Sequence, residues 1–251
     1  MTRVAGPKAA LDSAYLAGSY ARWRNSRLGQ ITDRLEESVI LELLGPVESL
    51  NLLDVGCGDG AMAAALSRCG ARVTGLDPDS RMLEAARRRA EAESLDLILV
   101  PGRAEHLPFA DRTFDRVVAV AVLCFIPQTD RAIAEMARVL KPGGRLVIGE
   151  LGRWSLWTAI RRARAWLGAP TWKAARFRTV VELRRLLERH GLTVREIRGS
   201  IYYPPFDLAA LLLGHLDLWF GRQTTFGAAF IVLSATKTLD RAYGGLATGP
   251  S

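Results

Sequence analysis

The amino-acid sequence predicts an α/β fold in which helices cover both faces of a mostly parallel sheet. Apolar segments with strand character alternate with helical segments between residues 50 and 149, a pattern typical of parallel sheets. Three alternate glycines follow the first expected strand, and an aspartate, Asp77, ends the second. Ligands of such sheets bind at the carboxyl ends of the strands, so both features indicate one binding crevice at that edge.

A helical segment is expected before the first strand, over residues 8–45. Apolar side chains recur there every four residues, which places them on one side of a helix; they are Ile31, Leu35, Val39 and Leu43. Gly45 and Pro46 end the pattern. The segment is therefore predicted to be a helical cap outside the sheet.

The central part of the chain is expected to alternate strand and helix. Its strands are predicted near residues 50–55, 72–77, 97–100, 114–122 and 145–149, its helices near 60–69, 79–93 and 129–140, and a loop over 101–113. Residues 141–144, Lys-Pro-Gly-Gly, are interpreted as a turn that leads into the last of these strands.

The C-terminal part is predicted to contain one helix and two further strands. The helix covers residues 179–190 and stops at Gly191, and the strands follow near 192–198 and 228–235. Residues 201–220 join these strands through a turn and an apolar helix, most of whose leucines are expected to pack in the core.

The loop after the first strand, Leu-Leu-Asp-Val-Gly-Cys-Gly-Asp-Gly at 52–60, indicates a nucleotide-like ligand. Gly56, Gly58 and Gly60 let the backbone turn and leave no Cβ in the way of a ligand. The carboxylate of Asp54 suits a cationic ammonium or sulfonium group and would repel a pyrophosphate. The glycines also fit the relaxed dinucleotide pattern, and Asp77 could accept from ribose hydroxyls in either case.

Two later motifs extend the pattern: GRAEHLPF at 102–109, followed by FDRVVAVAV at 114–122, and RVLKPGGRLVI at 138–148. With them the chain resembles the class I S-adenosylmethionine-dependent methyltransferases, in the type 11 group that includes the ubiquinone and menaquinone biosynthesis methyltransferases. The resemblance covers roughly residues 15–150. It implies a Rossmann-like sheet of seven strands with an antiparallel final strand, and S-adenosyl-L-methionine as cofactor. Dinucleotide-type dehydrogenases usually lack such an ending, which argues against NAD.

The resemblance also implies which residues hold the cofactor. Asp54 and the loop of Gly56, Gly58 and Gly60 would surround the methionine part, and Asp77 would take the ribose. The other implied contacts are Pro78 after Asp77, Arg103, Ala104 and Glu105 beside the adenine, and Ala121 on the methionine side. Relatives commonly carry aspartate where this chain has Arg103, and many carry histidine at the positions of Cys124 and Phe125. No catalytic residue is assigned.

Composition favours one domain in a reducing compartment. The chain has 251 residues, of which 49% are hydrophobic, enough to bury a sizeable core. Its three cysteines are too few for a disulfide framework or a zinc site, and no metal site is expected. The N-terminus lacks the apolar run of a signal peptide. The parts of the predicted domain are a cap (8–45), a cofactor-binding core (46–151), an insertion (152–178), a C-terminal part (179–237) and a tail (238–251).

Positive charge is concentrated in one region. The formal net charge is +8, yet residues 153–198 alone carry 12 basic and 3 acidic side chains. Such a local surplus, and the lack of an Asn/Asp-Pro-Pro-Tyr/Phe motif at the usual place, argue against a nucleic-acid substrate. Tryptophans and arginines interleave in 153–178, as in helices that lie on anionic membranes. The alternative is an amphipathic helix packed on the sheet with a solvated arginine side. A cytoplasmic location is expected, and peripheral membrane contact through 153–178 stays open.

The expected reaction is transfer of a methyl group, by in-line displacement, to a small apolar or aromatic acceptor. Two alternatives are a membrane-associated quinone or lipid methyltransferase, and a non-catalytic accessory protein that binds the cofactor. Candidate acceptor contacts lie in the cap and between the last two strands. They are Tyr15, Tyr20, Tyr202, Tyr203 and His215.

Overall fold

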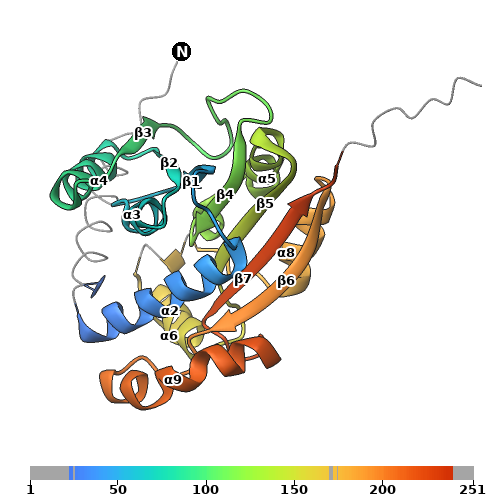
Figure 1. The fold of residues 1–251 in the computed structure, drawn as a ribbon. Helices are drawn as coiled ribbons and strands as arrows, with labels where there is room; N and C mark the ends of the chain where they lie inside the picture. The colour runs from blue at the N-terminus through green and yellow to red at the C-terminus, as the bar shows by residue number, and fades with distance from the viewer. Residues whose placement is uncertain (1–22, 25, 170–171, 174, 240–251) are drawn as a thin grey trace, which may run out of the picture.

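The sheet has the predicted α/β architecture. The computed structural model describes residues 23–24, 26–169, 172–173 and 175–239, so Tyr15 and Tyr20 lie outside the described residues. Seven strands form one sheet in the order β3-β2-β1-β4-β5-β7-β6 (Figure 1). Their bounds are β1 Asn51–Val55, β2 Arg72–Asp77, β3 Leu97–Pro101, β4 Phe114–Val120, β5 Leu140–Leu151, β6 Leu192–Ser200 and β7 Phe230–Lys237.

Strand β7 is antiparallel to both of its neighbours, β5 and β6, and the remaining neighbouring pairs are parallel. This arrangement confirms the Rossmann-like sheet with an antiparallel final strand. Because β1, β2 and β4 are parallel neighbours, their carboxyl ends lie at one edge of the sheet, where the glycine loop begins.

Helices cover both faces of the sheet. They are α2 Arg27–Leu44, α3 Ala61–Arg68, α4 Ser80–Glu93, α5 Thr129–Val139, α6 Leu156–Trp166, α8 Val180–Glu188 and α9 Asp207–Gln223, with a short 3-10 helix, η1, at Leu123–Phe125. Alternate strand residues point to opposite faces: Leu53 packs with α5 and α8, and Leu52 packs with α2, α3 and α9. The helix α2 confirms the part of the predicted cap that lies within the described residues. The division of the chain into parts stays a prediction.

The turn predicted at residues 141–144 lies inside β5. The strand starts at Leu140, which pairs with Phe114, and the register shifts before the next pair, Arg116 with Arg145. The extra residues of β5 are accommodated by this shift, and Gly143 adopts a left-handed φ of 75°. Residues 141–144 pair with neither β4 nor β7, so the predicted turn is found as an interruption within β5 rather than before the strand.

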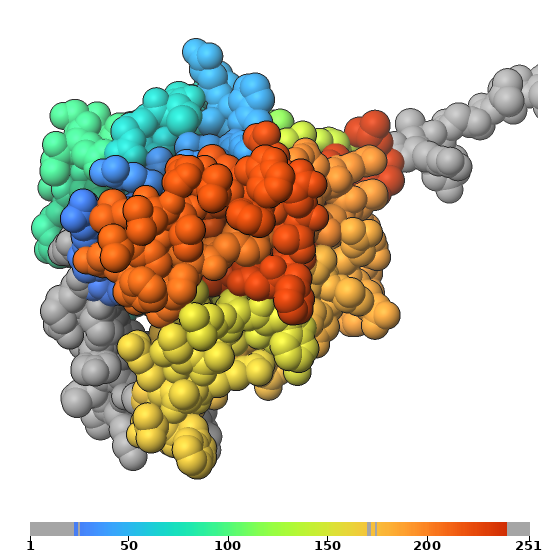
Figure 2. All heavy atoms as spheres, turned by 90° about the horizontal axis from the view of Figure 1, so that it is seen from below, coloured from blue at the N-terminus to red at the C-terminus, as the bar shows by residue number. Residues whose placement is uncertain are grey.

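Helix α9 does not bury its leucines as expected. Its inward side consists mainly of small residues, Ala209, Ala210 and Gly221, and Gly221 lies against the backbone of Gly199 on β6. This close approach leaves the large side chains on the outer side, which Figure 2 shows facing the viewer in orange. The exposed ones are Leu208, Leu211, Leu212, Leu213, Leu216, Leu218, Trp219 and Phe220. The prediction of core packing for most of these leucines was wrong.

Candidate functional site

The glycine loop connects β1 to α3 through left-handed backbone. Gly56, Gly58 and Gly60 have φ angles of 73°, 54° and 76°, which glycine adopts without a steric penalty. The amide of Gly56 donates to the carbonyl of Leu76 over 2.7 Å, which ties the loop to β2. A Cβ on Gly56 would overlap Val122, whereas a Cβ on Gly58 would meet nothing within 4 Å. The backbone at Gly58 is therefore open to an approaching ligand.

Asp77, at the end of β2, holds this loop in place. Its Oδ2 accepts from the amide of Gly58 over 3.0 Å, and its Oδ1 accepts from the amide of Asp79 over 2.9 Å. Burial raises the pKa of the Asp77 carboxyl above its ordinary value. Each carboxylate oxygen has more than one acceptor position, so Asp77 can still accept a hydroxyl beside the loop. Pro78 follows directly.

Asp54 is the least satisfied acid at this edge. Its side chain is 1% exposed, and its Oδ2 has no hydrogen-bond partner among the described residues. Burial, and next the nearby Asp77 carboxylate, raise the pKa of Asp54 to about 7. An isolated buried carboxylate is costly, and a cationic ligand at the glycine loop would offset that cost. The orphaned Asp54 oxygen and the open backbone at Gly58 fit an adenosyl sulfonium cofactor.

Asp59 fastens the glycine loop to two helical segments. Its carboxylate pairs with Arg24 over 2.9 Å and with Arg89 of α4 over 2.7 Å. Arg24 also pairs with Asp33 of α2 over 2.6 Å. The loop is thereby tied to the residues before α2. The sequence did not predict these ion pairs, because an aspartate between two glycines gives no indication of its distant partners.

The adenine-side residues lie in the turn after β3. Ala104 is buried, and Arg103 is exposed and pairs with Glu105 over 3.2 Å. Ala121 follows β4, where its φ is 51° and its amide donates to Gly149 of β5 over 2.7 Å. The implied cofactor residues thus follow β1, β2, β3 and β4. Their contacts with the cofactor stay predictions.

Three ionisable groups that the sequence did not connect with the site are Glu150, Glu36 and Arg161. Glu150, near the end of β5, is buried; its Oε1 accepts from the amide of Leu123 over 2.8 Å, and its Oε2 has no partner among the described residues. Burial raises the pKa of Glu150 to about 7 and that of Glu36 on α2 to about 8. The third group is Arg161 of α6. The position of Glu150 was detectable, since it lies next to the carboxyl end of a strand, as Asp77 lies at the end of β2. The proximity of Glu36 and Arg161 was not.

The acceptor candidates occupy different surroundings. Tyr203 is buried between α2 and α6: its hydroxyl lies 3.0 Å from Thr32 Oγ1, and its carbonyl accepts from Trp157 Nε1 over 2.7 Å. The hydroxyl of Tyr202 donates to the carbonyl of Thr224. His215 is exposed on α9. The structure thus does not bring Tyr202, Tyr203 and His215 together, and their acceptor contacts stay predictions.

Comparison with known proteins assigns the chain to a family. A family model described as a methyltransferase domain matches residues 53–148, from β1 to β5. An uncharacterized protein of Mycobacterium bovis, Mb2026c, is 32% identical over 223 residues, which are 87% of this chain and 71% of that protein. The chain belongs to the S-adenosylmethionine-dependent methyltransferases. The cofactor of this methyltransferase is S-adenosylmethionine.

Two relatives with named activities cover smaller parts. Methyltransferase GfsG of Streptomyces halstedii is 40% identical over 127 residues, 49% of this chain and 45% of GfsG. Ubiquinone biosynthesis O-methyltransferase of Methylobacterium sp. is 32% identical over 164 residues, 63% of this chain and 66% of that enzyme. This methyltransferase therefore spans about half to two thirds of the length of these relatives.

The fold is shared with a solved structure from Thermotoga maritima, described as a SAM-dependent methyltransferase and possible histamine N-methyltransferase. The TM-score is 0.68 at 24% sequence identity, over 88% of this chain and 95% of that chain. At this identity the similarity shows the fold of the methyltransferase alone.

Proposed function

We propose that this methyltransferase moves a methyl group from S-adenosylmethionine to a small acceptor with an apolar or aromatic body. The observation that carries the proposal is the buried, unpartnered Asp54 oxygen next to the open backbone at Gly58. A neutral or anionic ligand would leave the Asp54 charge uncompensated. A sulfonium cofactor with an α-ammonium group compensates it.

The cofactor, when bound, supplies an electrophilic methyl group on a sulfonium sulfur. The chain's own residues orient it: Asp77 accepts from ribose hydroxyls, Asp54 balances the positive charge, and the loop from Gly56 to Gly60 gives close backbone contact. Methyl transfer is an in-line displacement, in which alignment of the acceptor supplies much of the rate. Tyr203 connects α2 and α6, since its hydroxyl lies 3.0 Å from Thr32 Oγ1 and its carbonyl accepts from Trp157 Nε1 over 2.7 Å.

The test is transfer of label from methyl-labelled S-adenosylmethionine into an extract of the source cells, separated into organic, aqueous and macromolecular fractions. Asp77→Ala protein serves as the control. The proposal expects label above the control in the organic or aqueous fraction. Label confined to macromolecules would contradict a small acceptor. If the protein binds S-adenosylhomocysteine but no fraction of the extract is labelled above the control, the result would favour a non-catalytic accessory protein that binds the cofactor.

A second candidate, a quinone or lipid acceptor reached at a membrane surface, is favoured by one surface. It comprises the exposed apolar side of α9 together with Trp154, Leu156, Trp166 and Leu167 around α6; Trp166 is 88% and Leu167 80% exposed. Figure 2 shows α9 in orange and α6 in yellow on the same face. Among the described residues, no helix combines the length and apolarity needed to cross a membrane.

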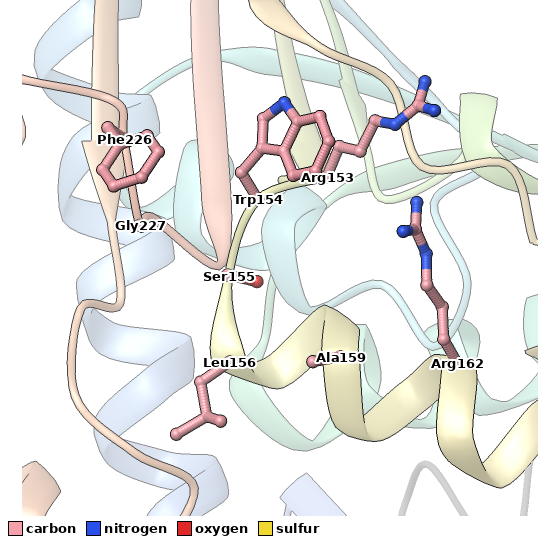
Figure 3. Close-up of a pocket in the computed structure, with 8 residues that line it drawn as sticks. All are labelled: Arg153, Trp154, Ser155, Leu156, Ala159, Arg162, Phe226 and Gly227. Atoms are coloured by element: carbon pink, nitrogen blue, oxygen red, sulfur yellow. The ribbon is translucent and has the colours of Figure 1, made fainter.

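Positive charge borders this surface, as an anionic bilayer requires. A hollow of about 380 Å³ lies at the start of α6, lined by Trp154, Leu156 and Phe226, with Arg153 and Arg162 at one side (Figure 3). None of the residues expected to bind the cofactor lines this hollow. The exposed rings next to guanidinium groups support contact with anionic lipid headgroups.

Vesicle sedimentation tests this candidate. The variant changes one exposed residue on each of the two helices, Trp166→Ala on α6 and Leu212→Gln on α9. Wild type is expected to sediment with vesicles of phosphatidylglycerol and phosphatidylcholine, and the variant to remain in solution. Ile98→Ser, an exposed apolar residue on β3, is the matched control. Equal sedimentation of wild type and variant would contradict the membrane surface.

A further inference from the structure

Arg161 is set apart from the other arginines of α6. Arg162 and Arg164 are exposed, as expected of a solvated side. The guanidinium of Arg161 instead lies 5.5 Å from the ring centre of Trp157 and 5.1 Å from that of Trp172. Its Nη1 is buried and has no hydrogen-bond partner among the described residues. A buried cation is costly unless it is paired.

The groups that face Arg161 come from elements far apart in the sequence. Glu36 of α2 and Cys124 of η1 both act electrostatically on Arg161. Cys124 in turn faces Glu150, and its thiol donates to the carbonyl of Ala121 over 3.4 Å. Ala121 is the residue expected beside the methionine part of the cofactor. The Arg161 cluster therefore borders the place where the methyl group is expected.

The acids in this cluster do not supply a full countercharge at neutral pH. Burial raises the pKa of Glu36 to about 8, so its carboxyl is mostly protonated at pH 7. The pKa of the Cys124 thiol is raised well above its ordinary value, again by burial first, so the thiol is neutral. Glu150 interacts electrostatically with Arg178 and accepts hydrogen bonds from the backbone amides of Leu123 and Cys124. Arg161 is left as a cation with an open donor.

We propose that Arg161 binds a carboxylate of the methyl acceptor, which makes the acceptor a small aromatic or apolar acid. The inference rests on the methyl-transfer function proposed above and adds the acceptor's charge. The planar guanidinium matches a carboxylate with two parallel hydrogen bonds. The indoles of Trp157 and Trp172 make the surroundings of Arg161 apolar and aromatic, which suits an acceptor with an aromatic body. The neutral Glu36 carboxyl does not repel the anion.

Three test ligands of nearly the same shape but different charge show whether binding requires a negative charge or only an aromatic ring. Benzoate is an anion, benzamide is neutral and benzamidine is a cation. Each is titrated at pH 7 into the full chain saturated with S-adenosylhomocysteine, and binding is followed by tryptophan fluorescence. Benzoate is expected to bind at least tenfold more tightly than benzamide, and benzamidine more weakly than both.

Variants assign the effect to Arg161. Arg161→Gln is expected to bring benzoate affinity down to that of benzamide and to leave the S-adenosylhomocysteine affinity within twofold. Arg164→Gln, an exposed arginine on the same helix, is expected to bind benzoate as wild type does. Arg161→Lys keeps the charge but not the paired geometry, so an intermediate affinity is expected.

Equal binding of benzoate and benzamide, no detectable benzoate binding, or an equal loss in Arg164→Gln would overturn the inference. In each case unchanged binding of S-adenosylhomocysteine would leave the methyl-transfer proposal standing. Failure of the wild-type protein to bind S-adenosylhomocysteine would instead contradict the methyl-transfer proposal.

Discussion

The cofactor side and the acceptor side of the site are built in different ways. On the cofactor side, the glycine loop is joined to β2 by two local hydrogen bonds, from the amide of Gly56 to the carbonyl of Leu76 and from the amide of Gly58 to the Asp77 carboxylate. On the proposed acceptor side, Arg161 of α6 interacts with Glu36 of α2 and Cys124 of η1, and Cys124 in turn interacts with Glu150 of β5. The first arrangement is local and fixed by the sheet. The second depends on tertiary contacts, and it is where acceptor specificity can differ between relatives with the same fold.

The largest expected effect comes from Asp77→Ala. It removes the expected ribose contact and both hydrogen bonds that hold Gly58 and Asp79. Affinity for S-adenosylhomocysteine should fall tenfold or more, equivalent to about 1.4 kcal/mol. Isothermal titration calorimetry measures the change, and Asp77→Asn, which keeps one acceptor oxygen, should lose less. Wild-type affinity in Asp77→Ala would show that the cofactor site is misplaced.

A smaller loss of cofactor affinity is expected from Gly58→Ala. The same substitution at Gly191 serves as the control for backbone strain. Gly58 and Gly191 both have left-handed φ angles and no atom within 4 Å of an added Cβ. Each substitution should cost about 1–2 kcal/mol of stability, because alanine is strained there. Only Gly58→Ala should also weaken cofactor binding, by roughly fivefold for a loss of about 1 kcal/mol. Urea unfolding measures the stability of both variants, and calorimetry measures their cofactor affinity. An equal loss of affinity in Gly191→Ala would contradict the interpretation that the cofactor approaches the backbone at Gly58.

The raised pKa of Asp54 predicts a pH dependence of cofactor affinity. Below about pH 7 the Asp54 carboxyl is mostly protonated, and above it the carboxylate forms. A cationic cofactor favours the carboxylate, so binding releases a proton and affinity should rise by a few-fold between pH 6 and pH 7.5. Calorimetry over this range should show a flat profile for Asp54→Asn. The same slope in both proteins would assign the pH dependence to another group.

The smallest effect is expected on the outer side of α9. Leu212→Ala removes an exposed side chain and should change the free energy of unfolding by no more than about 0.5 kcal/mol. Leu43→Ala, on the buried side of α2, should cost about 2–5 kcal/mol. Urea unfolding compares the two. A cost of several kcal/mol for Leu212→Ala would mean that the outer side of α9 is covered in the protein.

The sequence predicted the elements whose signals are local. The glycine loop, Asp77 and the strand and helix alternation follow from backbone chemistry and periodicity. The strands β1 to β4 and the helices α3, α4, α5 and α8 begin and end within two residues of the predicted bounds, whereas β5 begins at Leu140, ahead of the predicted residue 145. The outward leucines of α9 were mispredicted because periodicity cannot tell which side of an all-apolar helix meets a neighbour. That side was decided by small residues, such as Gly221 against Gly199. The prediction of a solvated or membrane-facing side for the arginines of 153–178 does not hold for Arg161, because its partners on α2 and η1 are distant in sequence.

The most direct test of the division between the two sides is the dissociation constant of S-adenosylhomocysteine, measured by calorimetry for wild type, Gly58→Ala and Arg161→Gln. The two-sided account predicts a weaker cofactor complex for Gly58→Ala and an unchanged one for Arg161→Gln. A loss of cofactor affinity in Arg161→Gln as large as that in Gly58→Ala would contradict it, because Arg161 would then belong to the cofactor side.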